Sequence, residues 1–181
     1  MKRAYLSLGS NLGDRRANIR QALGRLEVQG VRTIRVSSLY KTEPVGYKTQ
    51  PWFLNCVAEV ETDLMPLQLV RRCRAIEREL GRRPGPHGGP RLIDVDILFY
   101  EAAVVRSAEV TIPHPRMAER RFVLVPLGEL SAHARHPVTQ QTVADMLHET
   151  SDASHVVKLR LHESQGGLRK QALPKSRIVR T

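Results

Sequence analysis

The chain has 181 residues, of which 41% are hydrophobic, 26% charged and only 4% aromatic. This length and composition are typical of a soluble globular domain with a substantial core. No apolar run approaches the length of a membrane span, and the N-terminal Met-Lys-Arg leads into no apolar signal-peptide core. We therefore expect a cytoplasmic protein with no membrane partner.

The formal net charge of +11 suggests a nucleic-acid partner, but the distribution of the charge argues against one. Residues 156–181 contain seven Lys and Arg residues and one acid, Glu163, so they carry +6 and leave only +5 for the rest of the chain. They also show little apolar periodicity. We predict one domain over residues 1–155, followed by a basic, solvated tail over 156–181 that can be disordered.

The first half of the chain alternates between strand and helix patterns. Asp14 is a suitable N-cap, and Ile19, Leu23 and Leu26 then recur at helical spacing. The predicted elements are a strand over residues 4–8, a helix over 14–28, a strand over 34–40 and a strand over 53–61.

The second half begins with a clearer helix. Leu69, Cys73 and Ile76 lie on one helical face, and Gly81 is a suitable residue to end the helix. We expect Pro126 to break a later helix. The helix with Leu69, Cys73 and Ile76 follows Thr62 and Asp63 and ends at Gly81. After it we predict a Gly- and Pro-rich loop over residues 82–91 and strands over 92–99 and 109–112. The helix broken by Pro126 lies within 116–130, and a short helix follows over 142–148.

The element order β-α-β-β-α-β is typical of the ferredoxin-like fold. We therefore predict an α+β protein with a mostly antiparallel sheet. Both main helices should pack on one face of this sheet, leaving the other face partly free. No internal repeat or domain linker precedes the tail.

The stretch GPRLIDVDILFY, residues 89–100, places two acids in an otherwise apolar strand. Because side chains alternate along a strand, Asp94 and Asp96 should lie side by side on one face. On a helix they would diverge by about 200°. The apolar members of the strand should face the opposite side: Ile93, Val95, Ile97 and Phe99.

Two interpretations of this acidic pair are open. Taken alone, Asp94 and Asp96 fit an exposed polar sheet face. Magnesium, however, takes one or two carboxylates together with substrate phosphates. Arg82 and Arg91 flank the preceding loop and can bind phosphate oxygens bidentately, while the glycines and prolines suit a lid. The combination favours phosphoryl chemistry.

The common nucleotide-binding motifs are missing. The sequence contains no GxxxxGK[S/T], and SLGSNLG near the N-terminus is not a GxGxxG fingerprint. A nucleotide would therefore have to be held by arginines and metal rather than by a P-loop.

Six stretches, taken in order, resemble the family of 6-hydroxymethyl-7,8-dihydropterin pyrophosphokinases, enzymes of folate biosynthesis. The resemblance covers about residues 4–150 and leaves the tail outside. The stretches are AYLSLGSNLGDRRANI at 4–19, SSLYKTEPVG at 37–46, QPWFLNCVAEVET at 50–62, IERELGR at 76–82, GPRLIDVDIL at 89–98 and IPHPRMAERRFVLVPL at 112–127.

The resemblance implies a ferredoxin-like fold and transfer of the β,γ-pyrophosphoryl unit of ATP to the pterin hydroxymethyl group, with release of AMP. It also implies two Mg²⁺ ions, bound by Asp94 and Asp96. These two acids, together with Arg82 and Arg91, match the catalytic positions. The positions that match ATP-binding residues are Glu77, Arg82, Arg91, Ile97, Thr111, His114 and Arg120.

For the pterin, the resemblance implies a ring stacked between Phe53 and Phe122, with Asn55 hydrogen-bonding its edge. Stacking of a flat heterocycle between aromatic rings gains burial and offset contacts, and edge amides fix its orientation. Without the resemblance, ordinary core packing would account for both phenylalanines. Backbone groups of Thr42, Pro44 and Val45 are expected on the same side.

The sequence departs from the family in the lid. Gly88 stands where a tryptophan is usual before GPR, His87 replaces an arginine, and Pro115 replaces a tyrosine after the PH pair. These departures concern the adenine contacts and lid closure rather than the acids.

Two other function classes remain as alternatives. An RNA-binding module on a ferredoxin-like sheet would explain the basic tail, but the Lys/Arg-Gly-aromatic signature is absent and aromatic residues are few. A metal-dependent phosphohydrolase would share the acids but not the pterin motifs. We expect a monomer that acts on small molecules and binds no nucleic acid.

Overall fold

Two long antiparallel strands, β1 and β4, form the centre of a six-stranded sheet in the computed structural model, which describes residues 1–83 and 88–160. The sheet order is β5-β1-β4-β3-β8, and β2 also pairs with β4, next to β3. The strands of this sheet are β1 (Lys2–Ser10), β2 (Val31–Val36), β3 (Tyr40–Thr42), β4 (Phe53–Thr62), β5 (Asp94–Tyr100) and β8 (Val156–Lys158).

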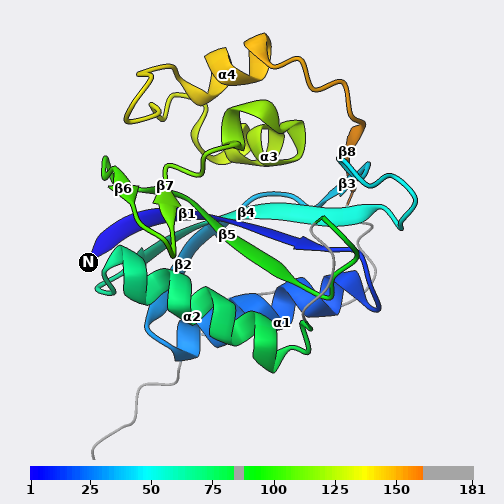
Figure 1. Cartoon of the computed structure of the whole chain (residues 1–181), viewed down its shortest axis with the longest axis horizontal. Coiled ribbons are helices and arrows are strands. Elements are labelled where there is room, and N and C mark those ends of the chain that lie inside the picture. The colour runs from blue at the N-terminus through cyan, green and yellow to red at the C-terminus, as the bar shows by residue number, and fades with distance from the viewer. Residues whose placement is uncertain (84–87, 161–181) are drawn as a thin grey trace, which may run out of the picture.

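Helices cover both faces of this sheet (Figure 1). On one face lie α1 (Arg15–Val28) and α2 (Pro66–Glu79), and on the other lie α3 (Arg121–Ser131) and α4 (Val143–Glu149). A small hairpin of β6 (Val105–Arg106) and β7 (Thr111–Ile112) and a 3-10 turn, η1 (Met117–Glu119), connect β5 to α3. Within the described residues, no helix is long and apolar enough to cross a membrane.

The core consists of two clusters separated by the sheet. Along β4, Cys56, Ala58 and Val60 face α1 and α2, whereas Val57 belongs to the cluster beneath α3 and α4. This is the alternation that one buried strand with a helix layer on each side requires. The second cluster covers only part of its face, so that the rest is left for polar side chains.

The predicted fold class is confirmed. When β2 and β3 are counted as one interrupted strand, the order is that of a ferredoxin-like sheet, with α1 and α2 on one face. The sequence predicted this strand as continuous over residues 34–40. It is interrupted because Ser37 binds β4 differently: its N–H donates to the Val57 carbonyl (2.9 Å), while its hydroxyl accepts from the Val57 N–H (3.0 Å).

Two local predictions were wrong. Helix α3 continues through Pro126, which lies at its middle and lacks only the one backbone N–H that would donate there. In β5 a register shift opposite Tyr5 and Leu6 turns Phe99 to the α3 side, whereas Ile97 faces α2. A β-bulge of this kind reverses the alternation beyond it, and the residue pattern gave no sign of it.

Strand β8 was not predicted. Val156–Lys158 lies beyond residue 155, the predicted end of the domain, and pairs antiparallel with β3. The sheet thus includes three residues that the sequence analysis assigned to the tail. Most of that predicted tail, residues 161–181, lies outside the described residues.

Glu129 ties α3 to the β3–β8 edge of the sheet. Its carboxylate accepts hydrogen bonds from the hydroxyl of Tyr40 (2.5 Å) and from the N–H and hydroxyl of Ser38 (3.1 and 2.8 Å), and Lys158 lies 3.4 Å away. Although partial burial opposes ionisation, the hydrogen bonds from Tyr40 and Ser38 outweigh it and lower the pKa of Glu129.

We expect Glu129→Ala to lower the free energy of unfolding by about 1–3 kcal/mol at pH 7, because several hydrogen bonds to a charged acceptor are lost. Urea unfolding of this variant measures the effect, with Glu27→Ala, at an exposed position of α1, as the control. Since the folded pKa is depressed, the contribution is present above the unfolded pKa of about 4.3 and is lost as pH falls through the folded value. A difference between Glu129→Ala and wild type that persists unchanged at pH 3 would contradict this assignment.

Candidate active site

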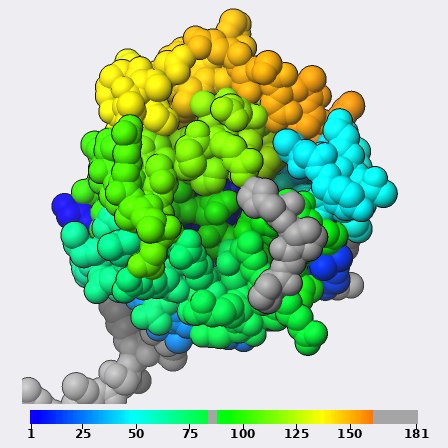
Figure 2. All heavy atoms as spheres, viewed as in Figure 1, coloured from blue at the N-terminus to red at the C-terminus, as the bar shows by residue number. Residues whose placement is uncertain are grey.

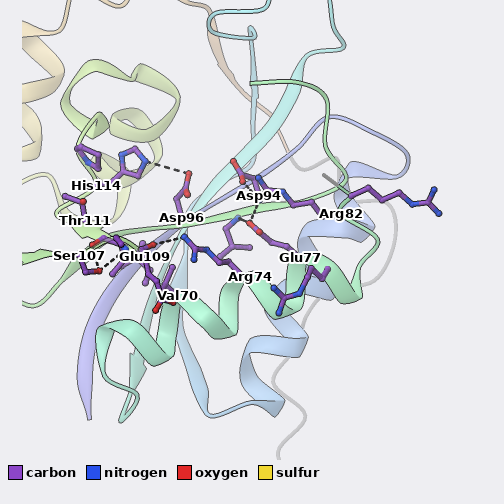
Figure 3. Close-up of a pocket in the computed structure, with 17 residues that line it drawn as sticks. Val70, Arg74, Glu77, Arg82, Asp94, Asp96, Ser107, Glu109, Thr111 and His114 are labelled. Atoms are coloured by element: carbon purple, nitrogen blue, oxygen red, sulfur yellow. Dashed lines mark hydrogen bonds and ion pairs between the residues drawn. The ribbon is translucent and has the colours of Figure 1, made fainter. Parts of the chain in front are cut away.

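Two adjoining cavities open at the carboxyl-rich start of β5. The first, of about 610 Å³, lies between α2, β5 and the turn between β6 and β7; we call it the helix cavity (Figure 3). The second, of about 530 Å³, lies over β1, β3 and β4 beside α3; we call it the sheet cavity. The face of the molecule seen in Figure 2 is hollowed between α3 above and α2 below. Both cavities are lined by the same four side chains: Arg82, Asp94, Asp96 and His114.

Asp94 and Asp96 project from β5 on one side, as the alternation predicted (Figure 3). Asp94 is paired at both oxygens, with Arg82 at 2.6 Å and Arg91 at 2.8 Å. Asp96 makes no hydrogen bond within the described part of the chain, and Nε2 of the His114 ring lies 3.9 Å from its carboxylate. Its side chain is 43% exposed and lines both cavities.

The recessed position of Asp96 has an electrostatic cost. Burial, followed by the charge of Asp94, raises the pKa of Asp96 to about 6, although Arg120, Arg82 and Arg91 act in the opposite direction. A cation bound nearby would favour the charged form of a carboxylate whose pKa is raised in this way. The pair therefore suits a hard divalent ion such as Mg²⁺, which binds oxygen ligands.

Protein ligands alone do not complete a metal shell here. In the two described ranges, no group of three His, Cys, Asp or Glu side chains is arranged to hold a metal ion. A magnesium ion bound by Asp94 and Asp96 would need further oxygens from phosphate and water, as is usual where Mg²⁺ accompanies a nucleotide.

Glu77 supports β5 from α2. It is buried, and its Oε1 accepts from the N–H of Val95 at 2.7 Å and lies 2.6 Å from Arg82. Burial raises the pKa of Glu77 to about 7, and the Val95 N–H and the Arg82 charge partly offset this. Since Val95 separates the two aspartates, Glu77 fixes the backbone between them. It also holds Arg82 at the junction of the cavities.

His114 faces Asp96 from the opposite wall (Figure 3). Burial, followed by the charges of Arg120 and Arg116, lowers the pKa of His114 to about 4, so the ring is neutral at pH 7. The N–H of Arg116 donates to Nδ1 at 3.2 Å, which assigns the ring proton to Nε2. His114 can therefore donate one hydrogen bond into the junction.

The sheet cavity has an aromatic and amide lining. Phe53 and Phe122 both line it, and the guanidinium of Arg120 lies 5.5 Å from the centroid of the Phe122 ring. Asn55 is buried and donates from Nδ2 to the hydroxyl of Thr42 at 2.6 Å. These groups can bind a flat heterocycle by stacking and by hydrogen bonds at its edge.

Gly9 makes room for the Asn55 amide. A Cβ atom on Gly9 would lie 2.4 Å from Oδ1 of Asn55, which is far closer than carbon and oxygen can approach. No role for Gly9 was predicted from the sequence, although a glycine near the end of a strand is a signal of close backbone approach.

The predicted site residues come together, with three differences. Arg91 and Arg120 were predicted on the ATP side, but of the two cavities they line only the sheet cavity. Arg120 immediately precedes α3. Pro44 is buried and lines neither cavity. His87 lies outside the described residues. The predicted residues that line a cavity are Thr42, Val45, Phe53, Asn55, Glu77, Arg82, Arg91, Asp94, Asp96, Ile97, Thr111, His114, Arg120 and Phe122.

Several cavity residues were missed. Arg74 and Arg78 of α2 line the helix cavity and, with Arg82 just beyond the helix, recur every four residues, a spacing that was visible in the sequence. Glu109 also lines this cavity. It is held by Arg71 at 2.6 Å and by Arg74, which donates to the Glu109 carbonyl at 2.6 Å. No sequence pattern indicated these contacts across 35 or more residues.

Comparison with known proteins identifies the family. Residues 5–132 match the family described as 7,8-dihydro-6-hydroxymethylpterin-pyrophosphokinase (HPPK). The 2-amino-4-hydroxy-6-hydroxymethyldihydropteridine pyrophosphokinase of Bacillus subtilis is 43% identical over 137 residues, which cover 75% of this chain and 82% of that protein. The protein with the same name from Methylorubrum extorquens is 44% identical over 132 residues, covering 72% and 84%.

Longer proteins also match. The folic acid synthesis protein fol1 of Schizosaccharomyces pombe is 48% identical over 147 residues, which are 81% of this chain but only 20% of that protein. A solved Plasmodium falciparum HPPK-DHPS structure aligns with a TM-score of 0.64 at 15% identity, covering 81% of this chain and 44% of that chain; this likeness concerns the fold. The family match and the extensive identity to the bacterial proteins together show that this chain belongs to the 7,8-dihydro-6-hydroxymethylpterin-pyrophosphokinase family.

Proposed function

We propose that this protein transfers the pyrophosphoryl unit of ATP to the hydroxymethyl group of 6-hydroxymethyl-7,8-dihydropterin. The products are the pterin diphosphate and AMP, and the reaction is a step of tetrahydrofolate biosynthesis. The observation that carries this proposal is the pair of adjoining cavities that share Asp94, Asp96, Arg82 and His114. A transfer between two bound molecules needs such a junction, whereas a hydrolase needs only one cavity.

In this proposal ATP occupies the helix cavity and the pterin occupies the sheet cavity. The pterin ring stacks between Phe53 and Phe122, with Asn55 at its edge and its hydroxymethyl group at the junction. The hydroxyl oxygen attacks the β-phosphorus and releases its proton to solvent, and the bond from that phosphorus to the bridging α–β oxygen breaks, so that AMP leaves with that oxygen. Holding the two reactants in line supplies a large part of the rate.

The arginines and His114 complement the charge that develops during transfer. Arg82 and Arg91 are placed beside Asp94 and can contact phosphate oxygens from the two sides of the junction. The neutral His114 offers its Nε2–H to the same region. Magnesium, for which we propose two ions bound by Asp94 and Asp96, would neutralise phosphate charge and polarise the phosphorus centre when bound.

We further propose that the protein acts as a monomer in the cytoplasm on small-molecule substrates. We propose no RNA-binding role for the free sheet face, because α3 and α4 cover part of it and the remainder carries Asp94 and Asp96 beside its arginines. Two carboxylates without metal would repel phosphates.

The direct test is AMP release from ATP and Mg²⁺ with and without the hydroxymethyl dihydropterin. We expect AMP only when the pterin is present, and none when EDTA removes the magnesium. ATP cleavage independent of the pterin would favour a phosphohydrolase and overturn the proposed transfer.

We expect Asp96→Asn and Asp94→Asn each to lower turnover by about two to three orders of magnitude, because each removes charge from the metal site. Steady-state AMP release at saturating substrates measures this, with circular dichroism to check the fold. Asp145→Asn on α4, far from both cavities, is the matched control. Turnover within threefold of wild type in either site variant would contradict the metal role.

The two variants should differ in stability without magnesium. Because the folded pKa of Asp96 is raised, its charge destabilises the fold increasingly as pH rises from about 4 through 6. Asp96→Asn should therefore be more stable than wild type at pH 8 and similar to it at pH 4. Asp94→Asn loses two arginine partners and should be less stable at pH 8. Thermal unfolding in EDTA at both pH values checks the prediction; equal effects of the two substitutions would contradict it.

A further inference from the structure

Strand β8 lies outside the part of the chain that matches the family, which ends at residue 132. In the sheet it lies beside β3 (Figure 1), and Thr42 of β3 lines the sheet cavity. Strand β3 has only three residues, and it is held between β4 on one side and β8 on the other. A strand this short depends on its neighbours for a defined position.

The backbone of residues 155–159 forms hydrogen bonds with the residues just before and just after β3. The N–H of Glu43 donates to the His155 carbonyl at 3.0 Å, and the N–H of Leu159 donates to the Leu39 carbonyl at 2.8 Å. Between these bonds, Lys41 is paired with Val157. The segment therefore spans the whole of β3 and reaches one residue beyond it in each direction.

Side chains reinforce this attachment at the end nearest the cavity. Nδ1 of His155 lies 3.2 Å from a carboxylate oxygen of Glu43, whose other oxygen lies 3.3 Å from Lys48. The His155 ring also packs against Trp52, with the centroids 6.3 Å apart, and Lys41 lies over the same tryptophan at 5.2 Å. His155 thus contacts both the residue that follows β3 and the residue that precedes β4.

The fastened residues form a wall of the sheet cavity. Thr42 and Glu43 both line it, and the Thr42 hydroxyl accepts the hydrogen bond that orients the Asn55 amide. A displacement of β3 would therefore change the edge of the cavity that meets a bound heterocycle. No residue of β3 or β8 lines the helix cavity.

We propose that the segment 155–159 is a structural part of the acceptor site, and that His155 is a positioning residue. By holding Thr42 and Glu43 in place, it sets the affinity for the flat heterocycle while leaving nucleotide binding unchanged. This inference rests on the proposed function, because it takes the dihydropterin as the occupant of the sheet cavity.

The backbone part of the proposal has a matched pair of variants. Along an antiparallel ladder, hydrogen-bonded residue pairs alternate with pairs that are not hydrogen-bonded. Since Glu43–His155 and Leu39–Leu159 are hydrogen-bonded, so is the pair Lys41–Val157 between them. The N–H of Val157 therefore points toward Lys41, and the N–H of Val156 points away from β3. Val157→Pro removes a donor to β3, and Val156→Pro does not. Pterin binding to the full chain is measured with Mg²⁺ and a non-hydrolysable ATP analogue present.

We expect Val157→Pro to raise the Kd for the hydroxymethyl dihydropterin about tenfold or more, and Val156→Pro to change it less than about threefold. The Kd for the ATP analogue should stay within about threefold of wild type in both. A folded Val157→Pro that binds the pterin as wild type does would overturn the proposal. So would equal losses of pterin and nucleotide affinity, since these indicate general loosening.

The side-chain part is tested at His155, which also provides the result if Val157→Pro does not fold. We expect His155→Ala to raise the KM for the pterin at least about threefold at unchanged kcat. His155→Asn, which keeps a donor for Glu43, should restore most of the affinity, and the exposed His148→Ala on α4 should match wild type. A lower kcat with unchanged KM, or no recovery in His155→Asn, would contradict the role. Wild-type protein that binds the pterin but releases no AMP contradicts the proposed function instead, and the binding comparisons then still test this inference.

Discussion

The arrangement of this site depends on the repulsion between two carboxylates placed two residues apart on one strand. Asp94 and Asp96 face the same way because β5 is extended, and Glu77 adds a third acid beside them. Positive side chains neutralise Asp94 and Asp96 to different extents. Asp94 takes both close arginines, and Asp96 is left with a neutral His114 and more distant cations. The unbalanced charge thus faces the junction of the cavities, where a cation and a polyphosphate can complete the balance.

The fold accommodates the two acids because helices cover one face of the sheet and only part of the other face. On one face α1 and α2 bury a continuous apolar cluster that includes Val95 and Ile97 of β5 and Ile93 just before it. On the other, α3 and α4 cover only part of the sheet, over Leu98 and Phe99. The bulge in β5 makes this possible, since it turns Phe99 towards α3 just beyond the acidic pair. One strand therefore serves the core with most of its residues and the site with two.

The sequence was sufficient for the parts of this design that rest on local periodicity. The period of two along residues 92–99 predicted the paired acids, and the helical spacing of Leu69, Cys73 and Ile76 predicted the α2 face that packs on the sheet. All but one of the site residues that the resemblance implied then line a cavity. Features that depend on contacts between distant segments could not be predicted. The bulge in β5, the side of Arg120 and the contacts of Glu109 are set by neighbours that no local pattern identifies.

Strand β8 shows the same limit and explains why it matters for function. Composition assigned Val156–Lys158 to a solvated tail, because residues 156–181 are strongly basic and show little apolar periodicity, and two adjacent valines alone did not outweigh this. Their position is determined by β3, which is itself too short to be stable alone, and by Glu129, which contacts Tyr40, Ser38 and Lys158 from α3. A wall of the sheet cavity is therefore held by two short strands, β3 and β8, whose positions depend on each other and on the contacts of Glu129. A segment outside the matched family region can affect binding there because β3 has no other neighbour on that side among the described residues.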